Sequence, residues 1–312
     1  MPIPFLIGGA AVALGATGLV KGAKALSDMS DAEDIGSRAE RKHRNKLKEV
    51  DEARQNTNNE LARLGKLKID IFSNQIKHVV DVVEKSKAKL QGFNEAVIVE
   101  QIPQLANIVT NSLELEKGLA SGLASGVLVG MGAYGSVGML ATASTGTAIS
   151  TLSGAAATNA TLAWLGGGSL AAGGFGMAGG TLVLGGIVTA PALAVMGFMA
   201  ASKAEEALTE ATKYSANIDL KVAKLDTVIT VLEGINKSAK ELQYALLKAV
   251  MIFEKEYKVD ENANKEDIAR MGAFVKILLK PLLNEPVIKN DGTAVEGILA
   301  RYEGQLKIAH KA

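Results

Sequence analysis

Residues 118–202 begin GLASGLASGVLVG and end TLVLGGIVTAPALAVMGFMAAS, and these 85 residues contain no Asp, Glu, Lys, Arg or His. The chain as a whole is 21% charged, and Lys117 and Lys203 border the segment directly. A charge-free run of this length is expected only where water is excluded, either in a lipid bilayer or in a dry protein interior. The way in which this segment is buried therefore decides the fold and the function of the chain.

Glycine is concentrated in the charge-free segment, which holds 20 of the 33 glycines of the chain. Four of them, Gly118, Gly122, Gly126 and Gly130, follow one another at intervals of four residues. On one helix they form a glycine zipper, a face along which a second helix can approach to backbone contact. Because each glycine weakens a helix in water by about 1 kcal/mol relative to alanine, we expect close packing in lipid or against a buried helix to offset this cost.

The end of the charge-free segment, residues 181–202, is the strongest candidate for a membrane-spanning helix. Its apolar surface includes Leu182, Leu184, Ile187, Val188, Val195 and Phe198. Residues 141–180 consist mostly of small residues, and Trp164 precedes three glycines in a stretch that we expect to form a turn at a membrane interface. The segment is long enough for two spans of about 20 residues and a tip, which predicts a hairpin.

Helical patterns flank the charge-free segment on both sides. Apolar residues recur three and four positions apart within 31–90, where the stripe is Ile69, Phe72, Ile76, Val79, Val83 and Leu90, with Ser86 in register between the last two. A second helix is predicted over about 94–117, and 203–257 is predicted as the longest helix of the chain. Two shorter helices are expected near 265–284 and 293–310. The fold class is therefore all-α, a bundle or coiled coil of long amphipathic helices around a glycine-rich hydrophobic hairpin.

These patterns divide the chain into five predicted parts. They are an N-terminal apolar helix (1–27), an amphipathic helical stalk (28–117), the glycine-rich membrane-inserting hairpin (118–202), a long amphipathic helix (203–262) and a C-terminal helical pair (263–312).

Residues 3–20, IPFLIGGAAVALGATGLV, form a second uncharged stretch. It is just long enough to associate with a membrane as a helix, which is the interpretation we prefer. A secretory signal would carry basic residues before the apolar run, whereas Lys21 and Lys24 come after it. The sequence leaves open whether this stretch is an anchor, a signal or a helix of the protein core.

The composition favours no catalytic, metal-binding or nucleic-acid-binding function. The chain has no cysteine, its net charge is +1 and 4% of its residues are aromatic. Its three histidines, His43, His78 and His310, lie far apart, and we expect all three at solvated helix positions. The GxGxxG pattern at 130–135 is not followed by the acidic residue that a dinucleotide site requires. We therefore expect no enzyme, catalytic residue, metal, cofactor, small-molecule substrate or nucleic-acid partner.

Long amphipathic helices on both sides of one glycine-rich, uncharged segment resemble the layout of soluble α-helical pore-forming proteins. The chain is similar in this respect to toxins of the cytolysin A and haemolysin BL type, and to proteins of the colicin and apolipoprotein L type. The resemblance covers about residues 28–257 and includes the glycine zipper, and the apolar run at 3–20 departs from it. It implies a segment that is hidden in a soluble form and inserts into a target membrane.

The leading hypothesis is a membrane-inserting helical protein that perforates or remodels a lipid bilayer. The expected partners are the lipid membrane, further copies of the chain in a homo-oligomer, and conceivably a partner subunit. The alternative is a constitutively membrane-anchored coiled-coil scaffold or a structural protein of a phage or cell envelope. Both place the protein at a membrane, and the sequence does not decide between secretion followed by insertion and permanent anchoring.

Overall fold

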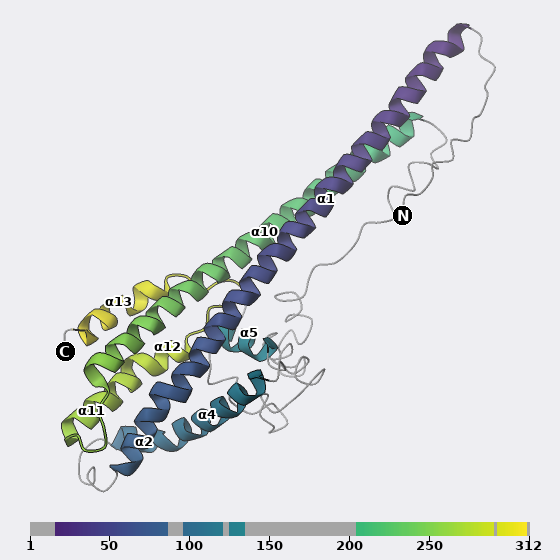
Figure 1. Cartoon of the computed structure of the whole chain (residues 1–312). Coiled ribbons are helices and arrows are strands. Elements are labelled where there is room, and N and C mark those ends of the chain that lie inside the picture. Colours follow the sequence, from purple (N-terminus) through teal and green to yellow (C-terminus); the bar gives the residue numbers. More distant parts are fainter. Residues whose placement is uncertain (1–15, 87–95, 121–124, 135–203, 290–291, 311–312) are drawn as a thin grey trace. The chain divides into compact units, whose positions relative to one another are not determined.

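The computed structural model describes residues 16–86, 96–120, 125–134, 204–289 and 292–310. These residues are mostly helical, and they contain no β-strand (Figure 1). An isolated bridge between Ile288 and Ala294 is the one extended pairing within these ranges. The prediction of an all-α fold is therefore confirmed.

The helices after residue 94 lie close to the predicted ranges, whereas the first helix runs without a break across the boundary that was predicted between residues 27 and 28. Helix α1 (Ala16–Ile71) leads directly into a π-helical turn, η1 (Phe72–Ile76), and then into α2 (Lys77–Lys85). The remaining elements in chain order are α4 (Ala96–Ala120), α5 (Ser125–Tyr134), α10 (Ala204–Ile252), η4 (Phe253–Tyr257), α11 (Lys265–Phe274), η5 (Val275–Leu279), α12 (Lys280–Asn284) and α13 (Ile298–Ala309). The predicted helix over 265–284 is thus interrupted by a π-helical turn, where the backbone pattern widens locally.

The chain divides into two compact units. Among the described residues, the first contains 16–50 and 204–227, and the second contains 51–86, 96–120, 125–134, 228–289 and 292–310. In the first unit, the described parts of α1 and α10 lie side by side through small buried residues. Ala32 packs with Ala207 and Ala211, and further along both helices Ala39 packs with Ile218 and Val222.

Ion pairs continue the contact between these two helices in the first unit. Lys42 pairs with Asp219 at 2.6 Å, and Lys46 pairs with Asp226 at 2.9 Å. Residue numbers increase in the same direction along both helices, so α1 and α10 run parallel there. Parallel neighbours cannot be joined by a tight turn, and the long stretch between α1 and α10 serves as the connection.

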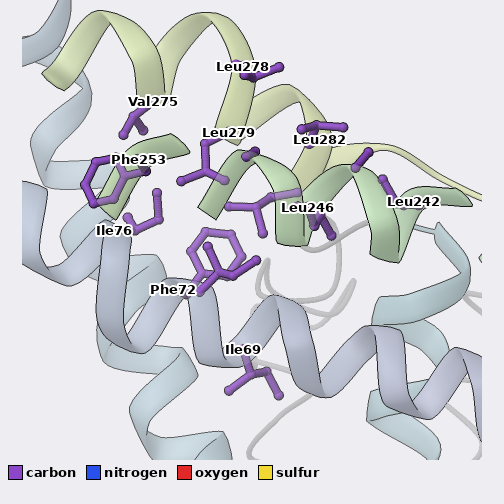
Figure 2. Close-up of a cluster of buried hydrophobic side chains, with 14 of the residues drawn as sticks. Ile69, Phe72, Ile76, Leu242, Leu246, Phe253, Val275, Leu278, Leu279 and Leu282 are labelled. Atoms are coloured by element: carbon purple, nitrogen blue, oxygen red, sulfur yellow. The ribbon is translucent and has the colours of Figure 1, made fainter. Parts of the chain in front are cut away.

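The second unit contains the main hydrophobic core, which is drawn in Figure 2. The stripe predicted along 69–83 is buried, and it faces the buried stripe of α10 and the helices that follow. The labelled members of this core are Ile69, Phe72, Ile76, Leu242, Leu246, Phe253, Val275, Leu278, Leu279 and Leu282. Each buried side chain of this size contributes about 1.5–3 kcal/mol, so the core fixes the second unit around the end of α1.

Helix α11 begins at a side-chain cap. Asn264 has an extended backbone, and its side-chain oxygen accepts a hydrogen bond from the backbone nitrogen of Asp267 at 2.8 Å. Such a cap satisfies one of the four backbone donors that a helix start leaves unpaired. The sequence predicted a break around Asp260–Asn264, and the structure assigns Asn264 as the residue that starts the next helix.

We expect Asn264→Ala to lower the free energy of unfolding by about 1 kcal/mol, because the first turn of α11 loses its cap. Urea denaturation followed by circular dichroism measures this change. Asn264→Asp is the matched control and should retain most of the stability, since a carboxylate accepts the same hydrogen bond. Equal loss in both variants would show that the cap does not stabilise the helix.

Several predicted features lie outside the described residues. They are the apolar run before Ala16, the end of the 31–90 stripe at Leu90, and the hairpin over 135–202 with its predicted tip and second span. Among the helices that the structure describes, none combines the length and the apolar character that crossing a bilayer requires.

Candidate functional site at Lys68 and the end of helix α5

The first part of the charge-free segment that the structure describes in detail is buried in protein. Met131 and Ala133 of α5 are fully buried, and Gly130 and Gly132 are buried with them. They pack into the main core of the second unit, together with Leu61 and Leu64 of α1. For residues 130–133, the absence of charge is therefore explained by a dry protein interior.

Helices α5 and α1 touch through their backbones at two glycines. A Cβ atom added at Gly65 would collide with the backbone carbonyl of Leu128, and one added at Gly132 would collide with the carbonyl of Leu61. The two contacts are reciprocal. Gly65 of α1 lies against the residue four positions before Gly132, and Gly132 of α5 lies against the residue four positions before Gly65. The order of the contacts shows that α5 runs antiparallel to α1 at this crossing. Only glycine permits such an approach, because it has no Cβ.

Lys68 lies one turn after Gly65 and is fully buried. Its Nζ atom donates hydrogen bonds to the backbone carbonyl of Met131, at 3.1 Å, and to that of Glu285, at 3.2 Å. Met131 is one of the last four residues of α5, whose carbonyls have no partner within the helix. The lysine therefore supplies a donor, and when protonated a positive charge, where the helix dipole is negative.

The neighbouring carbonyl at the end of α5 is satisfied by the segment that follows α12. The backbone nitrogens of Val287 and Ile288 donate to the carbonyl of Ala133, at 2.8 and 3.1 Å. The end of α5 is thus held by donors from α1 and from the chain after α12. We call this arrangement, formed by Lys68, Met131, Ala133, Glu285 and the amides of 287–288, the α5 clamp.

Burial lowers the pKa of Lys68 to about 7, and the nearby negative charge of Glu285 opposes this shift. Desolvation is the larger cause because a buried ammonium loses its hydration shell. The two carbonyl acceptors restore only part of that loss. Near neutral pH the clamp therefore contains both the charged and the neutral form of the lysine.

Glu285 connects the clamp to α13. Its carboxylate accepts hydrogen bonds from Arg301 Nη2, at 2.6 Å, and from the hydroxyl of Tyr302, at 2.7 Å. Burial raises the pKa of Tyr302, and the hydrogen bond to the carboxylate raises it further. The backbone of Glu285 is extended, as expected for a residue before a proline. Helices α1, α5 and α13 therefore meet around Lys68 and Glu285.

The chemistry available at the clamp is structural. Lys68 is enclosed, and its described hydrogen bonds go to backbone carbonyls, so the amine holds a helix end rather than facing a substrate. The clamp fixes the last described turn before residue 135. It is the candidate functional site because it holds the last part of the charge-free segment that the structure describes.

The structure brings together few of the residues that the sequence singled out. Gly118 lies in α4, whereas Gly126 and Gly130 lie in α5, and of these the structure describes the surroundings of Gly130 alone. Gly122 lies outside the described residues. So do the predicted inserting residues Trp164, Leu182, Leu184, Ile187, Val188, Val195 and Phe198. The zipper and the second span therefore stay predictions.

The expectation that all three histidines are solvated is wrong for His43, which is buried, and only partly met by His78, which is half-buried. His43 is 6% exposed, and its pKa is lowered by burial and by the nearby charge of Lys221. His78 is half-buried, and its Nε2 atom lies 2.9 Å from the backbone carbonyl of Val259. His310 is exposed, as expected. The sequence did not show which of the polar positions on these helices face a neighbouring helix.

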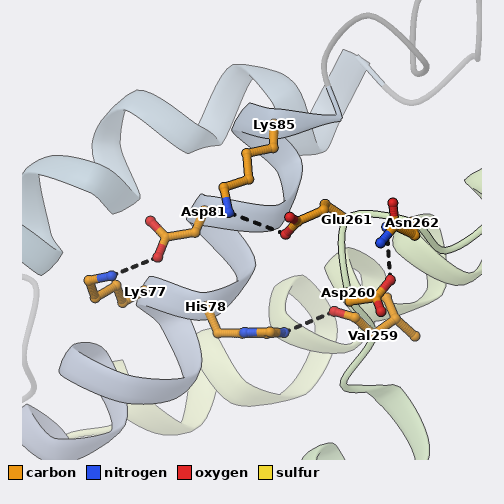
Figure 3. A network of polar contacts seen from close by, with 8 residues as sticks. All are labelled: Lys77, His78, Asp81, Lys85, Val259, Asp260, Glu261 and Asn262. Carbon is orange, nitrogen blue, oxygen red and sulfur yellow. Dashed lines mark hydrogen bonds and ion pairs between the residues drawn. The ribbon is translucent and has the colours of Figure 1, made fainter.

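His78 belongs to a group of polar contacts that joins α2 to the turn after η4 (Figure 3). Lys85 pairs with Glu261 across this contact at 3.2 Å, and Lys77 pairs with Asp81 within α2 at 2.6 Å. These ion pairs are largely exposed, and such pairs contribute at most about 1 kcal/mol each. The group fixes the turn and has no feature of a binding site.

Sequence analysis missed Lys68 and Gly65, although one signal was present. Lys68 lies four positions after the buried Leu64 and four before the buried Phe72, so it interrupts an apolar stripe at helical spacing. A charged residue on such a stripe indicates either a break in the core or a buried polar contact. The acceptors could not be found from sequence, because Met131 and Glu285 are distant in the chain.

Within the described ranges, no group of three or more His, Asp or Glu side chains is placed so that it could hold a metal ion. Comparison of the chain with protein-family models, with characterised proteins and with solved structures finds no match in any of the three.

Proposed function

We propose that this protein inserts its charge-free segment into a lipid bilayer and perforates or remodels it, with the segment arranged as a glycine-rich hairpin between long helices. The observation that carries the proposal is the absence of charge over 85 residues in a chain that is otherwise rich in charge. A dry protein interior accounts for residues 130–133, and residues 135–202 lie outside the described residues.

The α5 clamp supports this proposal because it gives the segment a fixed starting point. The helix before residue 135 is held by Gly65, by Lys68 and by the chain at 285–288, while the next described helix begins at Ala204. Because residues 130–133 are held in the core, the rest of the charge-free segment can move from water or protein into lipid without unfolding the helices around α5. The proposed role is therefore mechanical rather than enzymatic.

The single tryptophan, Trp164, provides a direct test of insertion. We expect its fluorescence emission to shift to shorter wavelength when lipid vesicles are added, because the proposed hairpin tip enters the membrane interface. Brominated lipids should quench it, and vesicles loaded with a self-quenched dye should release their contents. Emission that is insensitive to vesicles of every composition, together with intact vesicles, would contradict the proposal.

We expect Val188→Lys to weaken vesicle binding by roughly 70-fold or more, since a lysine at the centre of a membrane helix costs about 2.5–3.5 kcal/mol. Leu220→Lys is the matched control. Leu220 is a 67%-exposed residue of α10, so this substitution adds the same charge outside the charge-free segment. Thermal melting measured beside vesicle binding separates the two environments. A Val188→Lys variant that melts earlier yet binds vesicles normally would show that the segment fills a protein core.

The same measurements decide against the alternative of a permanently anchored scaffold. A chain that purifies without detergent and binds vesicles only after mixing supports insertion after folding. A chain that requires detergent from the start and releases no dye would favour the scaffold.

A further inference from the structure

The outward face of α10 in the second unit carries a regular stripe of exposed residues. These residues are spaced alternately four and three positions apart, and the stripe continues into η4 and its C-terminal cap. Its members are Glu233, Lys237, Lys240, Tyr244, Leu247, Met251, Glu254 and Lys258. From Glu233 to Met251, within α10, this is the 3.5-residue spacing of a helix–helix seam, and Glu254 and Lys258 extend it into the wider π-helical turn and its cap. We call this set the α10 seam. The buried stripe on the opposite side of α10 serves the core, so the α10 seam is a second, separate helix face.

The centre of the α10 seam is apolar and exposed. Tyr244 is 55% exposed, Leu247 is 50% exposed and Met251 is 72% exposed. Single exposed apolar residues are ordinary, but three at successive seam positions form a continuous patch. The patch lies between two neighbours. On one side α1 contacts α10 through Glu60 and Gln243, at 2.8 Å.

On the other side of the patch, the segment before α13 and α13 itself contact α10. Ser238 donates a hydrogen bond to the carbonyl of Val295 at 2.7 Å, and Glu241 accepts one from the backbone nitrogen of Leu299 at 3.4 Å. The exposed patch therefore lies on the part of α10 between these two sets of contacts.

The charges at the ends of the α10 seam have a definite order. The sequence of seam positions reads acidic, basic, basic, three apolar, acidic, basic. Glu233, Lys237 and Lys240 form no ion pair with any of the residues that the structure describes. Glu254 and Lys258 pair with each other at 2.7 Å, which places both on one side of η4.

We propose that the α10 seam binds the same seam of a second copy of this chain in antiparallel orientation. When Tyr244 packs against Leu247 of the second copy, Lys240 meets Met251, Lys237 meets Glu254 and Glu233 meets Lys258 of that copy. A twofold axis repeats each contact, so one register gives four apolar or aliphatic layers in the middle and two ion pairs at each end. The methylene stem of Lys240 can cover Met251 while its ammonium remains in water.

The charges exclude the parallel arrangement. In parallel register each seam residue meets its own copy, which places Lys237 against Lys237, Lys240 against Lys240 and Glu254 against Glu254. Like charges at facing positions of a helix pair are repulsive and select the other orientation. The next antiparallel register, with Leu247 on Met251, places Lys240 opposite Lys258 and is disfavoured for the same reason.

Cysteine cross-linking tests the orientation, because the chain has no cysteine of its own. Lys240→Cys and Met251→Cys are prepared as two full-length variants, with tags of different size, and are mixed under mild oxidation. The proposal expects the mixed disulfide to predominate. Each variant alone should cross-link poorly, since identical positions lie about 16 Å apart along the axis in the antiparallel pair. Predominance of disulfides between identical variants would overturn the proposal.

A charge exchange tests the register by sedimentation velocity over a range of protein concentrations. Lys237→Glu should weaken the dimer at least fivefold by placing two acidic residues opposite each other. The double variant Lys237→Glu/Glu254→Lys should restore it, because the ion pair is rebuilt with reversed sign. Circular dichroism verifies that each variant is folded. A folded wild-type chain that stays monomeric, or a double variant no better than the single one, would show that the seam does not pair in this way.

A lipid surface is the competing occupant and gives a different result. Leu247→Ser would then abolish binding to vesicles containing phosphatidylserine while the wild-type chain remained a monomer in solution. That outcome would overturn the proposal and assign the patch to the membrane. Loss of the dimer in Leu247→Ser, with vesicle binding unchanged, supports pairing between copies and leaves the proposed membrane function to be judged by Trp164.

Discussion

Replacing Gly132 by alanine is expected to lower the free energy of unfolding by about 4 kcal/mol. The added methyl group would overlap the backbone carbonyl of Leu61, and a backbone atom cannot rotate aside as a side chain can. Overpacking an interior costs about 1–3 kcal/mol when side chains adjust, and more when the main chain must move. Gly65→Ala should act in the same way, because its methyl group meets the carbonyl of Leu128.

Gly304→Ala is the control for both variants. Gly304 is an exposed residue of α13, and a Cβ added there meets no atom within 4 Å. An alanine in a helix interior is otherwise favoured over glycine by about 1 kcal/mol, so this variant should be stabilised. Urea denaturation of the three variants measures the difference. If Gly132→Ala were stabilised like Gly304→Ala, the close approach of α5 to α1 would be wrong.

The stability of the folded chain is expected to rise with pH above neutrality because of Lys68. Its pKa is about 7 in the folded state and about 10.4 in an unfolded chain. Between these values the unfolded chain binds one proton more than the folded chain, so stability increases by about 1.4 kcal/mol per pH unit. The contribution is fully present above the unfolded pKa and is lost as the pH falls to about 7, and it stays constant below that.

Lys68→Met isolates this contribution. Methionine has a similar length, removes the titrating group and leaves the carbonyls of Met131 and Glu285 without their donor. We expect the difference in unfolding free energy between wild type and Lys68→Met to change by about 2.3 kcal/mol in total between pH 7 and pH 9, and to be level between pH 5 and pH 6. Parallel stability curves over the whole range would show that the lysine is not buried as described.

Much of the fold follows from helical periodicity. The stripe from Ile69 to Val83 is buried, and on α10 the predicted stripe is buried at Ile235, Leu242 and Leu246. Asn264 lies between the two predicted helices 203–257 and 265–284, and the structure shows that it caps α11. These features are local, since a helix face and its cap depend on residues within a few positions of one another. The local pattern did not show that α1 and α10 run parallel, because chain direction depends on contacts between distant segments.

The candidate site was not predictable in the same way. The sequence pointed to Gly118, Gly122, Gly126 and Gly130 as packing glycines, which stays a prediction. It did not point to the backbone contact that the structure describes at Gly65 and Gly132. A lone glycine in a charged helix carries no spacing signal, and its role depends on which carbonyl lies opposite. Lys68 disturbed the apolar stripe visibly, but a disturbance does not identify the acceptors that compensate it.

The amino-acid sequence was enough to predict that the chain is largely helical and that one long segment avoids water. Periodicity and the cost of burying charge depend on short stretches of the chain, so both can be read from neighbouring residues. Three features became visible only in the folded structure: α5 crosses α1 at two glycines, a buried lysine holds the end of α5, and a second face of α10 is exposed. Those features depend on contacts between distant parts of the backbone. The free energy of burying an amine, and the closeness that a glycine permits, are set by the groups that surround each residue in the folded chain.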